Sequence, residues 1–373
     1  MLPIFRRACC LISLIASSCL SASPLPEQLD AYGVVKSDGV TLKMTGNTMV
    51  YAMASPLFTD YALKFRTITL PPGSRVGYQA QGILDFPTGT VISKTFYYAR
   101  DPQQVGAWVK STASDSVESI DLRQYQLVET RILQRVADGT WLANTYVWNP
   151  EQTSATLRRI GLTVNARLHD PVTQQTVALE YGVPNARQCQ TCHAVNATVG
   201  QSGIEPIGPK ARFLNLDYGY STGRLNQLVK LGQLAAWDEL PADLATVSRT
   251  VAYADPKSGS IEQRARAYAD INCAHCHHRM GDARQSGLFL NLDAAGSHLG
   301  ICKQHVAAGS GGGNLVFDIV PGKPDQSLLV TRMEATTGQA MMPRVGRSLV
   351  DKEGVQLLRS WIASMGGNCE VNR

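Results

Sequence analysis

The 373-residue sequence predicts an α+β multidomain protein: a β-rich, sandwich-like N-terminal domain followed by two mainly α domains. Two observations on the pattern carry this prediction. Runs of β-branched and aromatic residues, separated by turn signals, fill the chain before residue 180. From residue 181 onward, helical periodicity takes over. The composition, 44% hydrophobic and 17% charged, is that of a chain that can bury real cores.

Residues 1–23 are expected to form an export signal. Arg6 and Arg7 give a positive start, the run from Ala8 to Leu20 is apolar, and small residues follow before Pro24. That run is shorter than the ~20 apolar residues of a spanning helix and is broken by serines. Ala16-Ser17-Ser18-Cys19 is a poor match to a lipoprotein cleavage box. A lipid anchor at Cys19 is therefore the alternative, and a discarded signal is the favoured interpretation.

Residues 24–180 are expected to be the β-rich domain. Three runs predict strands: Thr90–Tyr98, Gln126–Val136 and Thr140–Trp148. Turn signals such as Asp138-Gly139 separate them. Several short strands with this spacing favour a sandwich or a barrel. The tryptophans of this region are expected in its core: Trp108, Trp141 and Trp148.

Residues 181–255 and 260–373 are expected to be two further regions. A helix is predicted over Arg224–Ala236 in the first. In the second, a helix over Ile261–Asn272 puts Ala265, Tyr268, Ala269 and Asn272 on one face. The last predicted helix runs from Asp351, as its cap, to Ser364, with one apolar side formed by Val355, Leu358, Trp361 and Ile362.

Each of these two regions contains one C-x-x-C-H string, the attachment pattern for c-type haem. The strings are Cys189-Gln-Thr-Cys192-His193 and Cys273-Ala-His-Cys276-His277. Two thiols can bond the two vinyl groups of one haem, and the adjacent histidine can ligate its iron. We therefore expect two haem c groups, held by Cys189, Cys192, Cys273 and Cys276, with His193 and His277 as iron ligands. Haem c is attached outside the bacterial inner membrane, so the expected location is the periplasm. Membrane anchoring as a lipoprotein is the alternative form of this location.

Zinc and thiol redox chemistry are the competing interpretations of the two strings. Zinc ribbons usually separate their cysteine pairs by ~15–20 residues, whereas Cys192 and Cys273 are 81 positions apart (273 − 192). A thioredoxin-like site has one C-x-x-C after a strand of a βαβ unit, and neither pair has that setting. Haem is therefore favoured over both.

Two cysteines, Cys302 and Cys369, are left outside the signal and the haem strings. In an oxidising compartment they suggest a disulfide that ties the C-terminal tail to the loop after the second string. Two separate buried thiols are the alternative.

The C-terminal third resembles a class I cytochrome c domain. The likeness lies in a helix that leads into C-x-x-C-H, a later Met-Pro step, and an amphipathic helix with a tryptophan. The stretches Pro321–Leu329 and Met341–Gly346 resemble cytochrome domains fused to bacterial periplasmic proteins. The whole mature chain is similar to a bacterial family of exported dihaem c-type cytochromes with a β-rich N-terminal domain. The segments that carry this similarity, besides the two strings, are Ser55–Ala62, Leu70–Gly73, Phe86–Phe96 and Val183–Asn185.

The resemblance implies two mainly α cytochrome c-like haem domains and a set of further ligands. Met342 is the implied sixth ligand of the second haem, because Pro343 follows it; Met341 and Met333 are rivals, and packing is the alternative role. Pro209 resembles the proline whose carbonyl accepts the proton of the ligating histidine, here His193. Arg344 and Arg347 are either partners of haem propionates or solvated. His275 and His278 are expected to be surface residues.

The first haem has no sixth ligand of the usual kind, because neither Met nor His occurs between His193 and His275. The ligand is absent or comes from elsewhere. The sequence leaves these candidates open: His169, Met44, Met49, Met53, Lys210 and Lys230.

The function predicted from these features is electron transfer between periplasmic redox proteins, such as a dehydrogenase or another cytochrome. The alternative is a dihaem peroxidase or oxidase that uses a five-coordinate first haem, although no polar distal group is recognisable for it. A purely structural role for the haems is a third reading. The formal net charge of +5 without a basic run predicts no nucleic-acid partner.

Overall fold

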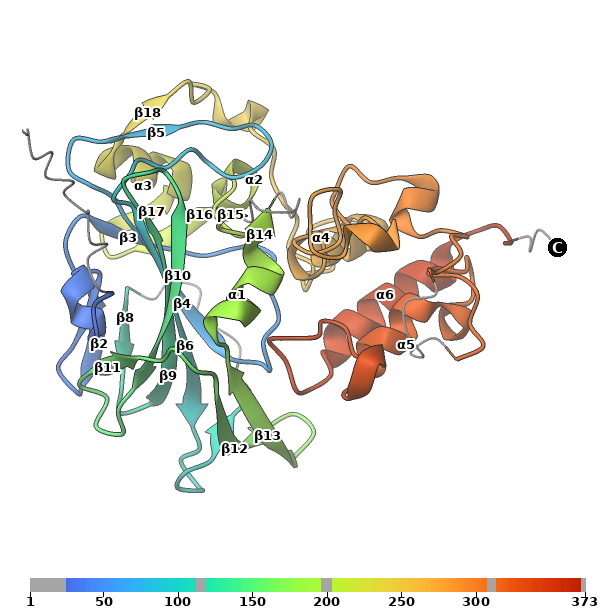
Figure 1. The fold of residues 1–373 in the computed structure, drawn as a ribbon, viewed down its shortest axis with the longest axis horizontal. Helices are drawn as coiled ribbons and strands as arrows, with labels where there is room; N and C mark the ends of the chain where they lie inside the picture. Colours follow the sequence, from blue (N-terminus) through green and yellow to red (C-terminus); the bar gives the residue numbers. More distant parts are fainter. Residues whose placement is uncertain (1–24, 112–117, 196–202, 307–312, 370–373) are drawn as a thin grey trace, which may run out of the picture.

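The computed structural model describes residues 25–111, 118–195, 203–306 and 313–369. It has a β-rich body, from which a smaller helical unit extends toward the C-terminus (Figure 1). The mixed α and β composition with a β-rich N-terminal part is therefore confirmed. The predicted export signal and Cys19 lie outside the described residues. Within those ranges, no helix has the length and apolar character needed to cross a membrane.

A nine-stranded mixed sheet forms the body. Its central strand β6 (Val91–Arg100) pairs on one edge with β9 (Tyr125–Arg135), which continues to β10 (Trp141–Trp148) and β11 (Ala155–Leu157). The other edge of β6 pairs with β4 and β7. The remaining strands on that side are β3 (Thr48–Tyr51), β4 (Leu63–Thr69), β7 (Trp108–Val109), β12 (Leu162–Asp170) and β13 (Gln175–Val183). The three strands predicted from sequence are β6, β9 and β10, each correct to within two residues.

Small two- and three-stranded sheets surround the large one. β1 (Val35–Ser37), β2 (Thr41–Met44) and β8 (Ser119–Asp121) form one of them. The parallel pairing of β5 (Arg75–Gly77) with β18 (Ala236–Asp238) joins residues 161 positions apart in the chain (236 − 75). Two short hairpins complete the set: β14 (Ala194–Val195) with β15 (Gly203–Ile204), and β16 (Asp217–Tyr220) with β17 (Gly223–Asn226).

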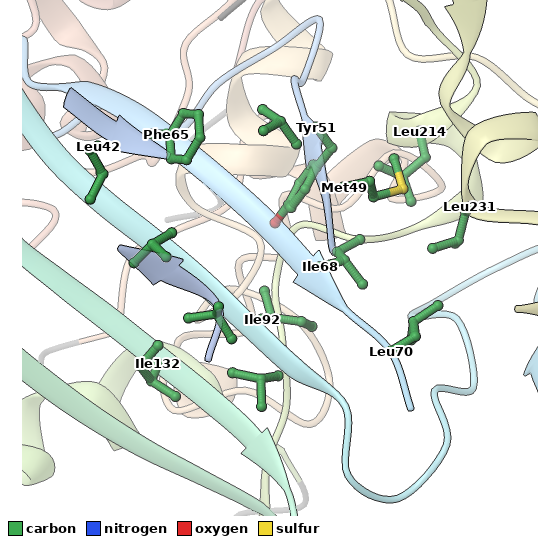
Figure 2. Packing of buried hydrophobic residues seen from close by; sticks show 14 of the residues in the cluster. Leu42, Met49, Tyr51, Phe65, Ile68, Leu70, Ile92, Ile132, Leu214 and Leu231 are labelled. Atoms are coloured by element: carbon green, nitrogen blue, oxygen red, sulfur yellow. The ribbon is translucent and has the colours of Figure 1, made fainter. Parts of the chain in front are cut away.

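The region expected as 181–255 shares the hydrophobic core of the sheet. Figure 2 shows Leu214 and Leu231 beside Met49, in the same cluster as Phe65 and Ile68. Its helices are α1 (Ala186–His193), α2 (Ala211–Leu214) and α3 (Gln227–Leu234). The predicted helix over Arg224–Ala236 is shorter than expected, because Gly223–Asn226 pairs as strand β17 instead. The three tryptophans predicted in the core are buried: Trp141 and Trp148 lie in this cluster, and Trp108 lies in a second buried cluster of the body.

The C-terminal unit has a core of its own, built from α4 (Ile261–Asn272), α5 (Leu328–Glu334) and α6 (Lys352–Ser364). The bounds of α4 agree with the prediction, and Ser260 and Gln263 form a capping box at its start. Asp351 caps α6 by accepting a hydrogen bond from the Gly354 N–H, as expected. Residue 354 must be glycine, since a Cβ there would overlap the Tyr268 ring of α4. The two helices thus pack at close range.

The predicted disulfide between Cys302 and Cys369 is present. It closes a stretch of 67 residues and ties the tail after α6 to the loop that follows the second C-x-x-C-H string. The interpretation of these residues as two separate thiols is wrong.

Buried polar contacts join the body to the C-terminal unit. The carboxylate of Asp60 accepts hydrogen bonds from the backbone N–H groups of Ser348 and Leu349, at 2.8–2.9 Å. Arg212 forms a buried ion pair with Asp270 of α4, at 2.7 Å. Because buried charges are costly unless paired, these contacts fix how the two parts dock.

Candidate functional site

The first C-x-x-C-H string forms the end of helix α1. Asn185 begins the helix: its side chain accepts a hydrogen bond from the Gln188 N–H, and Gln188 bonds back to the Asn185 N–H. This capping box fixes the helix start. Cys189, Cys192 and His193 then follow at i, i+3 and i+4, so all three lie on one side of α1.

The second string follows helix α4 directly. Cys273 is the C-cap of α4, and its carbonyl accepts hydrogen bonds from the N–H groups of Cys276 (3.1 Å) and His277 (2.9 Å). A tight turn therefore holds these residues after the helix. The four cysteines of the two strings, Cys189, Cys192, Cys273 and Cys276, are half-buried free thiols.

Both motif histidines have the hydrogen bonding of metal ligands. The Nδ1 of His193 lies 2.7 Å from the Glu205 carbonyl, and that of His277 lies 3.3 Å from the Leu288 carbonyl. A proton on Nδ1 that is donated to a carbonyl leaves the Nε2 lone pair free for a metal. Burial lowers the pKa of both His193 and His277 to about 4, which keeps the rings in the neutral, ligating form.

The acceptor for His193 is not the one expected from the resemblance. We predicted the Pro209 carbonyl, but the carbonyl of Glu205 takes this position. Pro209 instead accepts a hydrogen bond from the Leu84 N–H at 3.3 Å. The prediction was right about the chemistry and wrong about the residue, because hairpin β14–β15 brings Glu205 back to the end of α1.

The two strings lie side by side. The sulfur atoms of Cys192 and Cys276 and a ring nitrogen of His275 lie within 4.8 Å of one another. The Cys276 thiol donates a hydrogen bond to the carbonyl of Thr191 at 3.2 Å. The neighbouring Cys276 thiol, and after it the His275 ring, lower the pKa of the Cys192 thiol to about 4. The prediction of surface positions for His275 and His278 is wrong: both are half-buried, and the Nδ1 of each is buried without a partner among the described residues.

A pocket lies between the sheet and the first string. Cys189 and His193 line it from α1, Arg66, Lys94 and Arg131 line it from the sheet, and residues 206–209 close one side. Of the six candidates for the sixth ligand of the first haem, Met53 is the one that lines this pocket. Sequence reasoning missed the three cations, although the alternation of strands β4, β6 and β9 could have placed them on one face.

The other five candidates lie in different surroundings. Met49 is fully buried in the core, and Met44 lies on β2 of the small sheet. His169 lies on β12, 3.2 Å from the Thr176 hydroxyl. Both lysines lie over aromatic rings: Lys210 is 6.0 Å from the ring centroid of Phe213, and Lys230 is 5.2 Å from that of Tyr220.

Met342 lies on the loop between α5 and α6, in the same unit as His277. Its N–H donates to the Arg332 carbonyl at 2.9 Å, and its own carbonyl accepts from the Arg347 guanidinium at 2.7 Å. Arg347 also donates to the carbonyls of Met333, Ala335 and Leu349. Arg347 is therefore neither solvated nor free for a propionate; it holds the Met342 loop.

The remaining residues named for this loop take different positions. Arg344 is exposed, which agrees with the solvated alternative. The rival ligand Met333 is buried in the core of the C-terminal unit, and Met341 is half-buried.

The donor set fits covalent haem attachment: each string presents two free thiols and one imidazole whose Nδ1 is fixed by a carbonyl. Comparisons with protein-family models, with curated proteins and with solved structures found no match.

Proposed function

We propose that this protein is an exported dihaem c-type cytochrome that transfers electrons between periplasmic redox partners. The observation that carries the proposal is the meeting of the two C-x-x-C-H strings, each with free thiols and a neutral, carbonyl-anchored imidazole. When bound, haem c supplies one-electron redox chemistry. The resemblance to a family of exported dihaem cytochromes points the same way.

Each residue of the two strings has a definite task in this proposal. Cys189 and Cys192 would bond the first haem, and Cys273 and Cys276 would bond the second. His193 and His277 would bind the iron through Nε2. Met342, on the loop that Arg347 fixes, would supply a thioether ligand to the second group. Thioether is a neutral ligand that raises the reduction potential, and a filled sixth position prevents substrate from binding there. The C-terminal unit is then the cytochrome c-like domain of the chain.

The contact between Cys192 and Cys276 supports a relay within one chain. These cysteines belong to different strings, and their sulfur atoms lie within 4.8 Å of each other. Groups bonded to them are therefore neighbours, one held by the body and the other by the C-terminal unit. With haem bound at both strings, such an arrangement would let an electron enter at one group and leave at the other.

A dihaem peroxidase or oxidase remains the second candidate, because one observation favours it. Lys94, Arg66 and Arg131 line the pocket beside His193, so polar groups are available near a first haem without a strong sixth ligand. Peroxide cleavage needs such groups to stabilise charge that develops on oxygen.

An optical titration separates the two candidates. We expect purified holoprotein to be reduced in two one-electron steps and to keep its spectrum when cyanide or peroxide is added. A high-spin band that cyanide removes, together with fast peroxide turnover, would assign the enzyme function instead. The variant Cys189→Ala/Cys192→Ala, which keeps only the second string, identifies the haem that responds.

A zinc site is the third arrangement that the geometry allows. Cys192, Cys276 and His275 supply three donors of the kinds zinc prefers. This cluster uses one cysteine from each string and leaves Cys189 and Cys273 without a role, whereas haem attachment uses all four. Metal analysis of the purified protein decides: two irons per chain support haem, and one zinc without iron rejects it.

A further inference from the structure

A row of cations crosses the face of the sheet that α1 covers. The strand register places Arg66 opposite Lys94, and Lys94 opposite Arg131, on β4, β6 and β9. Directly opposite residues share a face of a sheet, as do residues two positions apart. Lys64 and Glu129 therefore belong to the same face, one step further along.

The positive charge of this row is only partly compensated. Glu129 is fully buried and pairs with Arg131 at 2.6 Å, while it also accepts a hydrogen bond from the Tyr181 hydroxyl. Lys64, Arg66 and Lys94 form no ion pair or hydrogen bond with any residue in the described part of the chain. The ammonium groups of Lys64 and Lys94 lie 6.0 and 5.2 Å from the ring centroid of Phe96.

Burial makes this excess charge costly. Arg66 is 7% exposed, and Lys64 and Lys94 are half-buried. Burial lowers the pKa of all three, that of Lys94 to about 7. A buried charge is normally offset by a partner of opposite sign. Arg66 and Lys94 face the pocket that Cys189 and His193 also line, so the space for such a partner lies against the first string.

We propose that Arg66 and Lys94, with Lys64 beside them, form an anion site that binds a carboxylate or another oxyanion against the first C-x-x-C-H string. A guanidinium binds a planar oxyanion through two parallel hydrogen bonds, and a lysine adds a point charge. Two sources could supply an anion of this chemistry. One is the propionates of the first haem, and this source rests on the proposed function. The other is a free oxyanion that enters the pocket.

The test uses the full-length protein as purified, with Arg66→Met and Lys94→Met as charge-removing variants and Lys36→Met as control. Lys36 is an exposed lysine on β1, outside the pocket. Removing a buried charge that has no partner stabilises a protein, whereas removing one that is paired destabilises it. With the anion present, as an attached haem or as added sulfate, we therefore expect lower melting temperatures for both pocket variants and no change for Lys36→Met.

Two further measurements assign the source of the anion. If it is the haem, both pocket variants lower the midpoint potential of one haem, because a lost cation favours the ferric state, and added sulfate has no effect on the wild type. If it is a free oxyanion, sulfate raises the melting temperature of the wild type in a saturable way and not that of the variants.

The proposal is overturned if the pocket variants melt at or above the wild-type temperature and neither potential nor sulfate response changes. Lys94→Arg, which keeps the charge, should retain wild-type behaviour and covers the case in which Lys94→Met does not fold. If the purified protein carries no haem, the proposed function is wrong and haem propionates cannot be the anion. The sulfate measurement still tests the anion site in that case.

Discussion

The sulfur atoms of Cys192 and Cys276 lie within 4.8 Å of each other, although 84 positions separate the two residues in the chain (276 − 192). Cys192 lies in the last turn of helix α1 of the body, and Cys276 follows the first helix of the C-terminal unit. The contact therefore exists only while these two parts are docked, and the residues that dock them control the candidate site.

Asp270→Asn should destabilise the protein strongly. Asp270 pairs with Arg212, and the side chains are 1% and 11% exposed. The substitution leaves the guanidinium buried without a countercharge, which costs about 3–5 kcal/mol. Asp238→Asn is the matched control, because its pair with Arg75 is exposed and its loss should cost less than about 1 kcal/mol. Denaturant unfolding measures both, and equal losses would contradict the role given to the buried pair.

The contact between Glu353 and the body should weaken in acid. Burial raises the pKa of Glu353, but hydrogen bonds from Lys110 and Tyr61 outweigh it and hold the pKa below its ordinary value of 4.5. Since the folded-state pKa is the lower one, this carboxylate stabilises the fold above about pH 4.5, and the effect fades as pH falls through the folded-state pKa. The unfolding free energies of wild type and Glu353→Gln should therefore differ at pH 7, and the difference should shrink steadily as the pH is lowered below 4.5. A difference that stays constant from pH 7 down through the acid range would show that the charge is not involved.

Loss of the disulfide should lower the free energy of unfolding and leave the proposed haem attachment unchanged. The Cys302–Cys369 bridge closes a 67-residue stretch. Loop-closure entropy then gives a stabilisation of about 4 kcal/mol as an upper value. The double variant Cys302→Ser/Cys369→Ser should unfold at lower denaturant concentration and keep its visible spectrum. An unchanged midpoint would mean that the bridge does not form in the exported protein.

Met342→Ala should change the second haem alone. The variant removes the thioether while Arg347 still holds the loop through backbone carbonyls. We expect loss of the weak far-red charge-transfer band that marks His/Met ligation, and a lower potential at one haem. Met341→Ala is the control, because Met341 is the neighbouring rival. If the band survives in Met342→Ala and disappears in Met341→Ala, the assignment is reversed.

Local patterns in the sequence predicted individual elements well. Alternation gave β6, β9 and β10 to within two residues, and the helical face of α4 gave its bounds. These elements are determined by neighbours in the chain, so their signals are local. The two C-x-x-C-H strings were recognisable for the same reason, because each string is five residues long.

Features that depend on distant contacts were not accessible. The Glu205 carbonyl replaces that of Pro209 as the partner of His193 because a hairpin brings it there. Residues of α2 and α3 share the core of the sheet, which no periodicity reveals. The cation row of Lys64, Arg66 and Lys94 appears only once the register of β4 and β6 is known.

Covalent attachment of two tetrapyrroles to one chain is the claim on which the proposed function depends, and intact-mass spectrometry of the protein exported by a bacterial host tests it most directly. The account predicts the mass of the processed polypeptide plus two haems, and plus one haem for Cys189→Ala/Cys192→Ala. A wild-type mass with no haem, or with a single one, would contradict it.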